Sequence, residues 1–142
     1  MKLTLYTDYS LRVLMYLGIH GDRSVTIGEI ASRHGISRNH VMKVVHELGQ
    51  LGYLQTIRGK NGGIRLGRLP EQINVGRLVR ETERNLELVE CFGPDHHCRI
   101  ASACVVKHTL SRALDAFFAV LDEYSLTDLL APEAKLHRLL AA

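Results

Sequence analysis

The chain has 142 residues, of which 46% are hydrophobic and 23% charged. This length predicts one domain, or one small domain with an appendage. The sequence has no apolar run of the roughly 18–20 residues that span a bilayer and no signal-peptide core, so we expect a cytoplasmic protein without a membrane partner. Residues 1–80 hold 12 Lys/Arg against 5 Asp/Glu, a net charge of +7, and residues 81–142 hold 6 against 10, a net charge of −4, so the basic half favours a polyanion partner.

The first predicted element is a helix over residues 8–20. Its apolar side chains recur at the three- and four-residue spacing of one helix face, and Thr7 or Asp8 is expected to cap its N-terminus. A carboxylate is favourable at that end of a helix. Capping therefore explains Asp8 before any other role is proposed for it.

A second helix is predicted over residues 27–34, because Thr26 and Glu29 have the spacing of a capping box and a glycine follows as a left-handed stop. Ser37 is then placed to cap a third helix, predicted over residues 38–51. Two capped helices joined by a short glycine turn are typical of a helix-turn-helix.

The third helix separates apolar from polar side chains. Its valines and leucines share one face, whereas basic and amide groups occupy the other face or the first turns. Such groups at the start of a recognition helix contact base edges and phosphates in the major groove. A solvated surface helix with incidental charges is the alternative. The predicted DNA-binding residues here are Ser37, Arg38, Asn39, His40 and Lys43.

Two short β runs, over about residues 53–57 and 64–68, flank a glycine-rich tip in which Asn61-Gly62 signals a hairpin turn. A basic hairpin directly after a recognition helix is typical of the wing of a winged helix, which lies on the DNA backbone or in a minor groove. A phosphate-binding loop is the alternative, but neither GxxxxGK[ST] nor a following helix is present. The predicted DNA-binding residues of the wing are Arg58, Lys60, Asn61, Gly62, Gly63 and Arg65.

Asn74 is expected to cap a helix over residues 75–85, which completes a DNA-binding domain at residues 1–85. The predicted fold is therefore mainly α with a small β-hairpin wing, a winged helix-turn-helix.

A long helix follows from about Ser102 to about Tyr124, with neither glycine nor proline inside it. Its wide apolar stripe predicts a homodimerisation helix over residues 105–130, with packing on the chain's own first helix as the alternative. Residues 131–142 have no predicted packing partner, so we expect a disordered tail.

All three cysteines lie within 14 residues, at positions 91, 98 and 104, in a predicted cluster-binding loop over residues 86–104. An odd number of cysteines cannot all pair within one chain, so a metal or iron–sulfur centre is predicted, and three inert buried cysteines are the alternative. Thiolates are the soft ligands that iron–sulfur centres use. The spacing lacks the close cysteine pairs of most structural zinc sites, although His96, His97 and His108 leave zinc open.

In this order of elements the chain resembles the NsrR/IscR-type iron–sulfur transcriptional regulators, and within them the nitric-oxide-sensing, NsrR-like members. The matching stretches cover nearly the whole chain. They are the opening Leu-Tyr-Thr-Asp-Tyr-Ser-Leu-Arg-Val-Leu, the Ile-Ala-Ser-Arg-His-Gly-Ile-Ser helix-turn-helix, the Arg-Gly-Lys-Asn-Gly-Gly wing, and the three cysteines before a long helix.

The resemblance implies a homodimer whose iron–sulfur cluster is held by Cys91, Cys98 and Cys104, with [4Fe-4S] favoured over [2Fe-2S]. NsrR-like members take the fourth ligand from an aspartate near the N-terminus of the other subunit, which corresponds to Asp8. IscR-like members use a histidine three residues after the last cysteine, where this chain has a lysine, and His108 follows one position later. This departure favours Asp8.

The function implied by the resemblance is a repressor that binds a double-stranded DNA operator and releases nitric-oxide detoxification genes when nitric oxide is present. Within the family, the alternative is an IscR-like regulator of iron–sulfur assembly. A winged-helix regulator that contains zinc is a second alternative. An iron–sulfur carrier, which would not bind DNA, is a third. The sequence has no nucleophile–base arrangement, paired catalytic carboxylates or nucleotide loop, so an enzyme is not expected.

Overall fold

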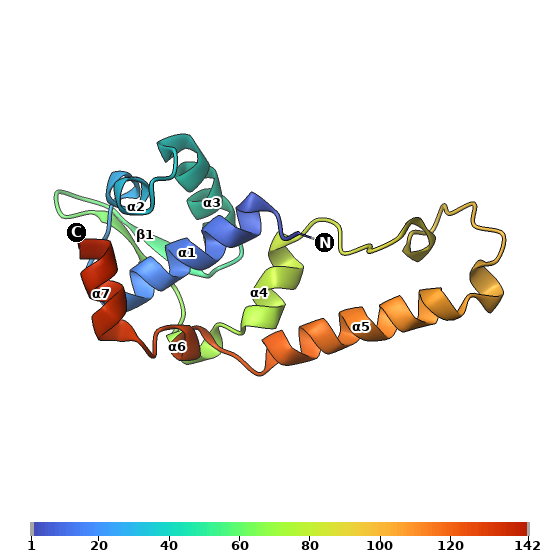
Figure 1. Cartoon of the computed structure of the whole chain (residues 1–142). Helices are drawn as coiled ribbons and strands as arrows, with labels where there is room; N and C mark the ends of the chain where they lie inside the picture. The colour runs from blue at the N-terminus through green and yellow to red at the C-terminus, as the bar shows by residue number, and fades with distance from the viewer. Residues whose placement is uncertain (1, 142) are drawn as a thin grey trace.

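The structure is a computed structural model that describes residues 2–141, and it shows a helical body from which one long helix and a loop extend (Figure 1). Within this described part of the chain, no helix is long and apolar enough to cross a membrane. The helices and strands are α1 (Leu5–His20), α2 (Ile27–His34), α3 (Arg38–Gln50), β1 (Leu54–Ile57), β2 (Gly63–Leu66), α4 (Val75–Thr82), α5 (Val105–Asp122), α6 (Leu126–Leu129) and α7 (Glu133–Ala141).

The body is a winged helix-turn-helix. Helices α1, α2 and α3 pack on one another, and β1 and β2 pair as an antiparallel hairpin after α3. Its core consists of apolar side chains, most of which the sequence places on inner helix faces. The largest fully buried side chains include Leu14, Tyr16, Leu17, Ile30, Leu48, Tyr53, Ile73 and Leu78.

Helix α1 begins earlier than the sequence predicts. Thr4 is its N-cap, where the Thr4 hydroxyl accepts a hydrogen bond from the backbone N–H of Thr7 at 3.3 Å. The prediction of Thr7 or Asp8 as the cap is therefore wrong. Asp8 lies in the first turn of the helix instead, where a carboxylate still interacts favourably with the helix dipole.

The caps of the helix-turn-helix follow the prediction in all but one detail. The Thr26 hydroxyl accepts from the N–H of Glu29 at 3.1 Å, and Gly35 ends α2 in the left-handed conformation. The carboxylate of Glu29 does not complete a capping box, because it accepts hydrogen bonds from Tyr16 and Arg23. The side chains of Tyr16 and Arg23 thus take the place of the backbone N–H that Glu29 would accept from in a capping box.

The wing forms where the sequence predicts it, but its turn is different. Ile57 pairs with Gly63, so residues 58–62 form the loop between the strands. The left-handed residue is Gly59, with φ of 109°, and the N–H of Gly62 donates to the carbonyl of Gly59 at 2.9 Å. Among the described residues only glycines have positive φ. The hairpin that Asn61-Gly62 signals is therefore present, but the left-handed residue of its loop is Gly59 and not Asn61.

The long helix leaves the body instead of packing on α1. It meets α4 near its C-terminal end, and Phe118 is its one buried residue. Side chains along the rest of the helix remain exposed, including Val105, Val106 and Val120. The alternative of packing along the first helix is therefore not what the structure has.

The prediction of a disordered tail over residues 131–142 is wrong for the residues that the structure describes; Ala142 lies outside them. Residues 133–141 form α7, which packs on α1 and α2. Its position follows from α6, where Leu126 is buried and its N–H donates to the carbonyl of Ile73 at 2.8 Å. The chain is thereby returned to the body, and Leu140 packs on the core.

Candidate DNA-binding and metal-binding sites

Helix α3 presents the predicted DNA-binding side chains to solvent. Its apolar face is buried, whereas the side chains of Arg38, Asn39, His40 and Lys43 are exposed. The Ser37 hydroxyl accepts from the N–H of His40 at 3.2 Å, so it fixes the start of the helix. Exposed groups on the first turns of a buried second helix have the placement that a major groove requires.

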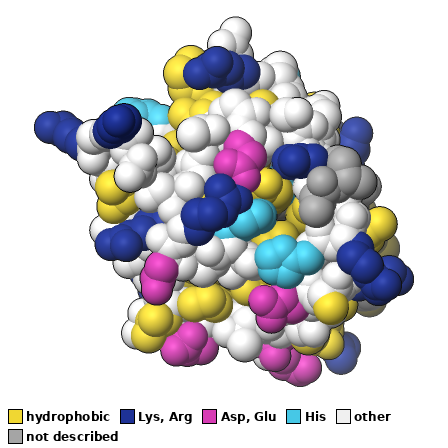
Figure 2. All heavy atoms as spheres, turned by 90° about the vertical axis from the view of Figure 1, so that its left-hand side faces the viewer, with side chains coloured by type: hydrophobic (Ala, Val, Ile, Leu, Met, Phe, Trp, Pro, Cys, Tyr) yellow, Lys and Arg dark blue, Asp and Glu magenta, His cyan; other side chains and the backbone are white. Residues whose placement is uncertain are grey.

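Basic side chains also occur around the wing. Figure 2 shows the face that lies on the left in Figure 1, where Lys and Arg side chains occupy mainly the upper half and Asp and Glu mainly the lower half. Arg58, Lys60 and Asn61 at the wing tip are exposed. A charge distribution of this kind attracts the phosphates of a nucleic acid on its positive side.

The wing glycines have a structural reason that the sequence alone does not reveal. A Cβ on Gly62 would lie 2.5 Å from the carbonyl oxygen of Ile57, and one on Gly63 would lie 2.6 Å from that of Val25. Val25 also pairs with Ile64 and joins the wing to the body. Gly62 and Gly63 therefore allow close backbone packing, whatever they contact in DNA.

Arg68, at the base of the wing, faces the body. Its guanidinium lies 4.5 Å from the ring centroid of Tyr53 and donates to the carbonyl of Leu51 at 2.5 Å. Burial, together with a hydrogen bond to Glu81, raises the pKa of Tyr53 to about 12, although Arg68 acts in the opposite direction. Arg68 is thus a packing residue, unlike the exposed cations of the tip.

The three cysteines lie on the loop before α5, which extends away from the helical body (Figure 1). All three are free thiols; Cys91 and Cys104 are half-buried and Cys98 is exposed. Nearby, the ring Nδ1 of His96 is buried without a hydrogen-bond partner. Among residues 2–141 no group of three or more His, Cys, Asp or Glu side chains is arranged to hold a metal ion.

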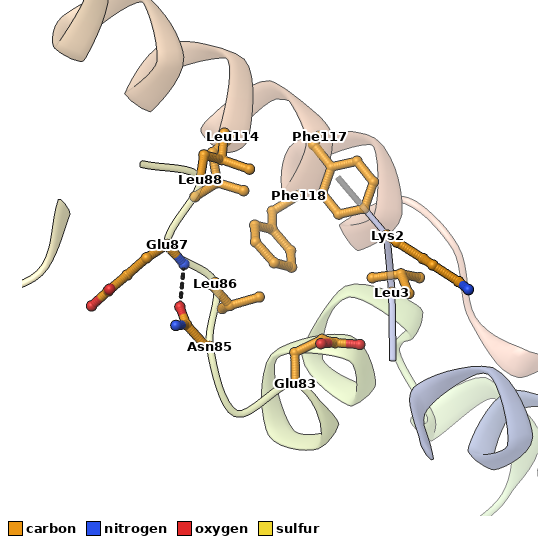
Figure 3. A pocket seen from close by; sticks show the side chains of 10 residues that line it. All are labelled: Lys2, Leu3, Glu83, Asn85, Leu86, Glu87, Leu88, Leu114, Phe117 and Phe118. Atoms are coloured by element: carbon orange, nitrogen blue, oxygen red, sulfur yellow. Dashed lines mark hydrogen bonds between the residues drawn. The ribbon is translucent and has the colours of Figure 1, made fainter. Parts of the chain in front are cut away.

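The start of this loop is anchored on α5. Figure 3 shows Leu86 and Leu88 pointing toward Leu114 and Phe118, around a pocket of about 360 Å³. The N–H of Glu87 donates to the side-chain oxygen of Asn85 at 2.7 Å, which turns the chain away from α4. The loop then runs out along α5 to the helix start, so the two segments form one arm.

Cys104 is both the last cysteine and the N-cap of α5. Its Sγ accepts from the N–H of Lys107 at 3.4 Å. Cys104 is thus fixed at the point where the loop meets the helix. His108 is exposed one turn further along the same helix.

Asp8 lies in the first turn of α1, on the helical body, whereas the cysteines lie on the loop before α5 (Figure 1). Its carboxylate pairs with Arg12 at 2.8 Å, and its side chain is 41% exposed. The structure thus brings the three cysteines onto one loop but does not bring Asp8 to them. An exposed carboxylate of this kind is accessible to a second molecule.

The sequence interpretation missed a polar cluster that fixes the start of α1. The N–H and the hydroxyl of Thr4 both donate to the carboxylate of Glu83, at 2.7 and 3.0 Å. The buried hydroxyl of Thr7 donates to that of Thr82 at 3.0 Å. Burial alone would raise the pKa of Glu83, but hydrogen bonds from Thr7 and Thr4 lower it. The cluster joins the helix that carries Asp8 to the end of α4.

The donor set fits an iron–sulfur centre in its chemistry. Three unpaired thiols lie on one turn-rich loop: Cys91 lies within a 3-10 turn at residues 90–92, and a second such turn, at residues 101–103, lies between Cys98 and Cys104. Thiolates are the ligands that such clusters use, and a carboxylate is an acceptable oxygen donor for iron. Among residues 2–141 of one chain, the thiols and the carboxylate of Asp8 do not come together as a ligand set.

Comparison with known proteins agrees with this architecture. The model of the Rrf2 family, described as iron-dependent transcriptional regulators, matches residues 3–132. The HTH-type transcriptional regulator NsrR of Bacillus licheniformis is 51% identical over 143 residues, covering 99% of this chain and 100% of the relative. The protein of the same name from Bacillus subtilis is 51% identical over 142 residues, covering 99% of this chain and 97% of the relative.

Solved structures share the fold. CymR, the global cysteine regulator of B. subtilis, has a TM-score of 0.72 at 28% identity, covering 91% of this chain and 95% of CymR. IscR of T. potens has a TM-score of 0.75 at 26% identity, covering 92% of this chain and 86% of IscR. The winged helix-turn-helix prediction is confirmed, and the relatives are regulators rather than enzymes. The chain belongs to the Rrf2 family of iron-dependent transcriptional regulators.

Proposed function

We propose that this regulator is a homodimeric repressor that senses nitric oxide through an iron–sulfur cluster. Its ligands in this proposal are Cys91, Cys98 and Cys104, together with the partner subunit's Asp8. The observation that carries the proposal is the position of three unpaired thiols at the far end of an exposed apolar helix. Identity of 51% to two NsrR proteins supports nitric oxide as the signal.

Dimerisation is supported by the surface of α5. A helix with one buried residue leaves much apolar surface in water, which monomeric proteins rarely tolerate. A second α5 in a symmetric pair would cover this surface. It would also carry a second cysteine loop toward the first subunit. Binding to an operator by such a dimer takes place in the cytoplasm, where thiols remain reduced.

The chain's own residues provide the switch. When bound, the cluster supplies iron with one position that no thiolate occupies, where a small diatomic molecule can compete. With Asp8 engaged, α1 of one subunit is joined to the loop of the other, which holds the two recognition helices at the roughly 34–36 Å repeat of adjacent major grooves. Once released, the carboxylate has Arg12 as its partner, as the structure has it.

The test is made on protein purified without oxygen. We expect iron and sulfide in the preparation, a cluster absorption spectrum, and selection of a preferred operator from a random duplex library. Nitric oxide should then lower the operator affinity by about 5–150-fold, the range of a typical allosteric coupling. Equal affinity before and after nitric oxide would contradict the proposal, and zinc without iron would favour the zinc-containing alternative.

An IscR-like regulator of iron–sulfur assembly is the second candidate, because His108 lies exposed one turn after Cys104. Residues four apart share one face of a helix, so this imidazole can approach a metal on the cysteine loop of its own chain. Asp8→Ala should change the cluster spectrum under our proposal, whereas His108→Ala should leave it as in the wild type. The opposite pattern would favour the second candidate.

A further inference from the structure

We propose that Tyr9 couples the ligand state of Asp8 to the recognition helix, through a ring contact with His40. This inference rests on the proposed function, because it takes Asp8 as a ligand of the cluster. Tyr9 is a positioning residue in this proposal: it contacts neither the cluster nor DNA. It transmits a change at the cluster to the residues of α3 that contact DNA.

The side chains form a continuous path. Tyr9 follows Asp8 in the first turns of α1, and Arg12, which pairs with Asp8 at 2.8 Å, has its guanidinium carbon 5.9 Å from the centroid of the Tyr9 ring. On its other side, the Tyr9 ring lies 5.9 Å from the His40 ring between centroids, with an angle of 45° between the planes. The path therefore leads from the ligand carboxylate to the first turn of α3.

The recognition helix has space beside this contact. An open pocket of about 430 Å³ separates the start of α1 from α3, and its lining includes Tyr6 and Tyr9 on one side and His40 and Lys43 on the other. The apolar face of α3, by contrast, is buried in the core. A packed core resists movement, so the pocket side is where the helix start can shift.

The other interactions across this pocket involve Glu47, in the C-terminal half of α3. Glu47 interacts with Tyr6 of α1, and it pairs at 3.8 Å with Arg84, whose side chain is 88% exposed. Exposed ion pairs contribute little to a structure because water and salt screen them. The ring contact between Tyr9 and His40 lies at the first turn of α3, whereas the interactions of Glu47 lie two turns further along the helix.

The consequence concerns base recognition. His40 follows Arg38 and Asn39, whose exposed side chains lead the recognition helix. When Asp8 exchanges between iron and Arg12, the first turns of α1 change either their position or their freedom to move. The Tyr9 ring carries this change to His40. A small shift of the first turn is enough to misplace base contacts, which depend on short hydrogen bonds of fixed direction.

The experiment compares Tyr9→Ala with Tyr9→Phe. Operator affinity is measured for the cluster-bound, the nitric-oxide-treated and the cluster-free protein, and the cluster is followed by its absorption spectrum and iron content. Tyr9→Ala should keep the spectrum and the iron content. Its affinity ratio between the cluster-bound and treated forms should fall to less than about twofold, from about 5–150-fold in the wild type. Tyr9→Phe retains the ring and should keep the wild-type ratio.

Two further variants locate the path. Leu5→Ala removes an exposed side chain from the same end of α1, in the lining of the same pocket, and should keep the wild-type ratio. In a His40→Ala background, Tyr9→Ala should produce no additional change in the ratio, because the two rings can no longer meet. An additional change there would overturn the proposal, since the coupling would then pass elsewhere.

Failure of the coupling is distinguishable from failure of the proposed function. A wild-type protein whose affinity ignores nitric oxide would overturn both. A wild type that responds, beside a Tyr9→Ala variant that responds by the same factor with the same spectrum, would overturn the coupling alone. Should Tyr9→Ala fail to fold, Tyr9→Leu retains apolar volume without a ring, and the same two outcomes decide.

Discussion

Gly76 shows how one residue determines the attachment of the arm to the body. It lies in α4 where α5 crosses, and a Cβ there would lie 1.9 Å from a carboxylate oxygen of Asp122 and 3.0 Å from its backbone nitrogen. Asp122 also accepts two hydrogen bonds from Arg80, at 2.6 and 2.8 Å. The guanidinium of Arg80 in turn lies 4.2 Å from the Phe118 ring centroid. A side chain at position 76 would therefore disturb the whole junction.

Gly76→Ala should destabilise the protein by about 1–3 kcal/mol, the usual cost of overpacking a filled site. The matched control is Gly28→Ala, also within a helix, where an added Cβ meets nothing within 4 Å. That change should be neutral or stabilising by roughly 0.5–1 kcal/mol, because alanine favours a helix more than glycine does. Urea unfolding of the cluster-free proteins measures both. Equal effects of the two substitutions would contradict the tight packing inferred for the junction.

Glu29 shows how a residue can take a partner that its local sequence does not indicate. Its spacing from Thr26 predicts a reciprocal capping box, but its carboxylate lies beside Arg23 and Tyr16. The hydrogen bond from Arg23 is the main reason that its pKa falls to about 2. A charged partner binds a carboxylate more strongly than a backbone N–H does. Local patterns cannot include a partner that only the turn and α1 bring close.

Among the elements, the wing separates cations that face solvent from one that faces the body. Lys60 is exposed at the tip, whereas Arg68 stacks on Tyr53 at the base. The sequence presents both simply as basic residues of a hairpin. The difference arises because β2 ends at Leu66, and the chain then turns back beneath the body.

Lys60→Ala should weaken DNA binding about equally for all sequences. It should also reduce the slope of log affinity against log salt concentration by about 0.9 for each phosphate that is no longer neutralised. Arg68→Ala should leave this slope unchanged and lower the melting temperature, because the Tyr53 ring and the Leu51 carbonyl lose their partner. Titrations at several salt concentrations test both expectations. A reduced slope for Arg68→Ala would show that this residue contacts phosphate.

At the scale of the whole molecule, the two groups of proposed donors lie on different parts of one chain. The body carries Asp8, in α1, and the arm carries the three cysteines (Figure 1). A symmetric dimer through α5 gives each arm a second body to meet. Sensing in the proposed mechanism is therefore a property of the dimer, since one chain does not contain a complete ligand set.

Val106→Glu should weaken the dimer by about a hundredfold or more, because an unpaired carboxylate in an apolar interface costs several kcal/mol. Val106 is 64% exposed within one chain, so folding itself should be unaffected. Leu139→Glu is the control: this leucine is 66% exposed on α7, away from the proposed interface. Sedimentation of the cluster-free proteins gives the dissociation constants. A dimer that survives Val106→Glu but not Leu139→Glu would place the interface on α7.

Much of the fold could be predicted because its signals are local. The caps at Thr26, Ser37 and Asn74 set helix starts that the structure has, because one side chain satisfies a backbone N–H within the same turn. The tail was mispredicted for the opposite reason. Whether α7 packs depends on where α6 returns the chain to the body, and no periodicity in residues 131–142 contains that information.

The candidate sites divide in the same way. The sequence by itself determined the winged helix, the cations of its recognition face, and three unpaired thiols on one loop, because these follow from spacing and side-chain chemistry along the chain. Only the tertiary structure decided that Asp8 pairs with Arg12 instead of joining the cysteines, and that Tyr9 contacts His40. Distances between elements depend on how their buried faces pack, and packing joins residues that have no pattern in common.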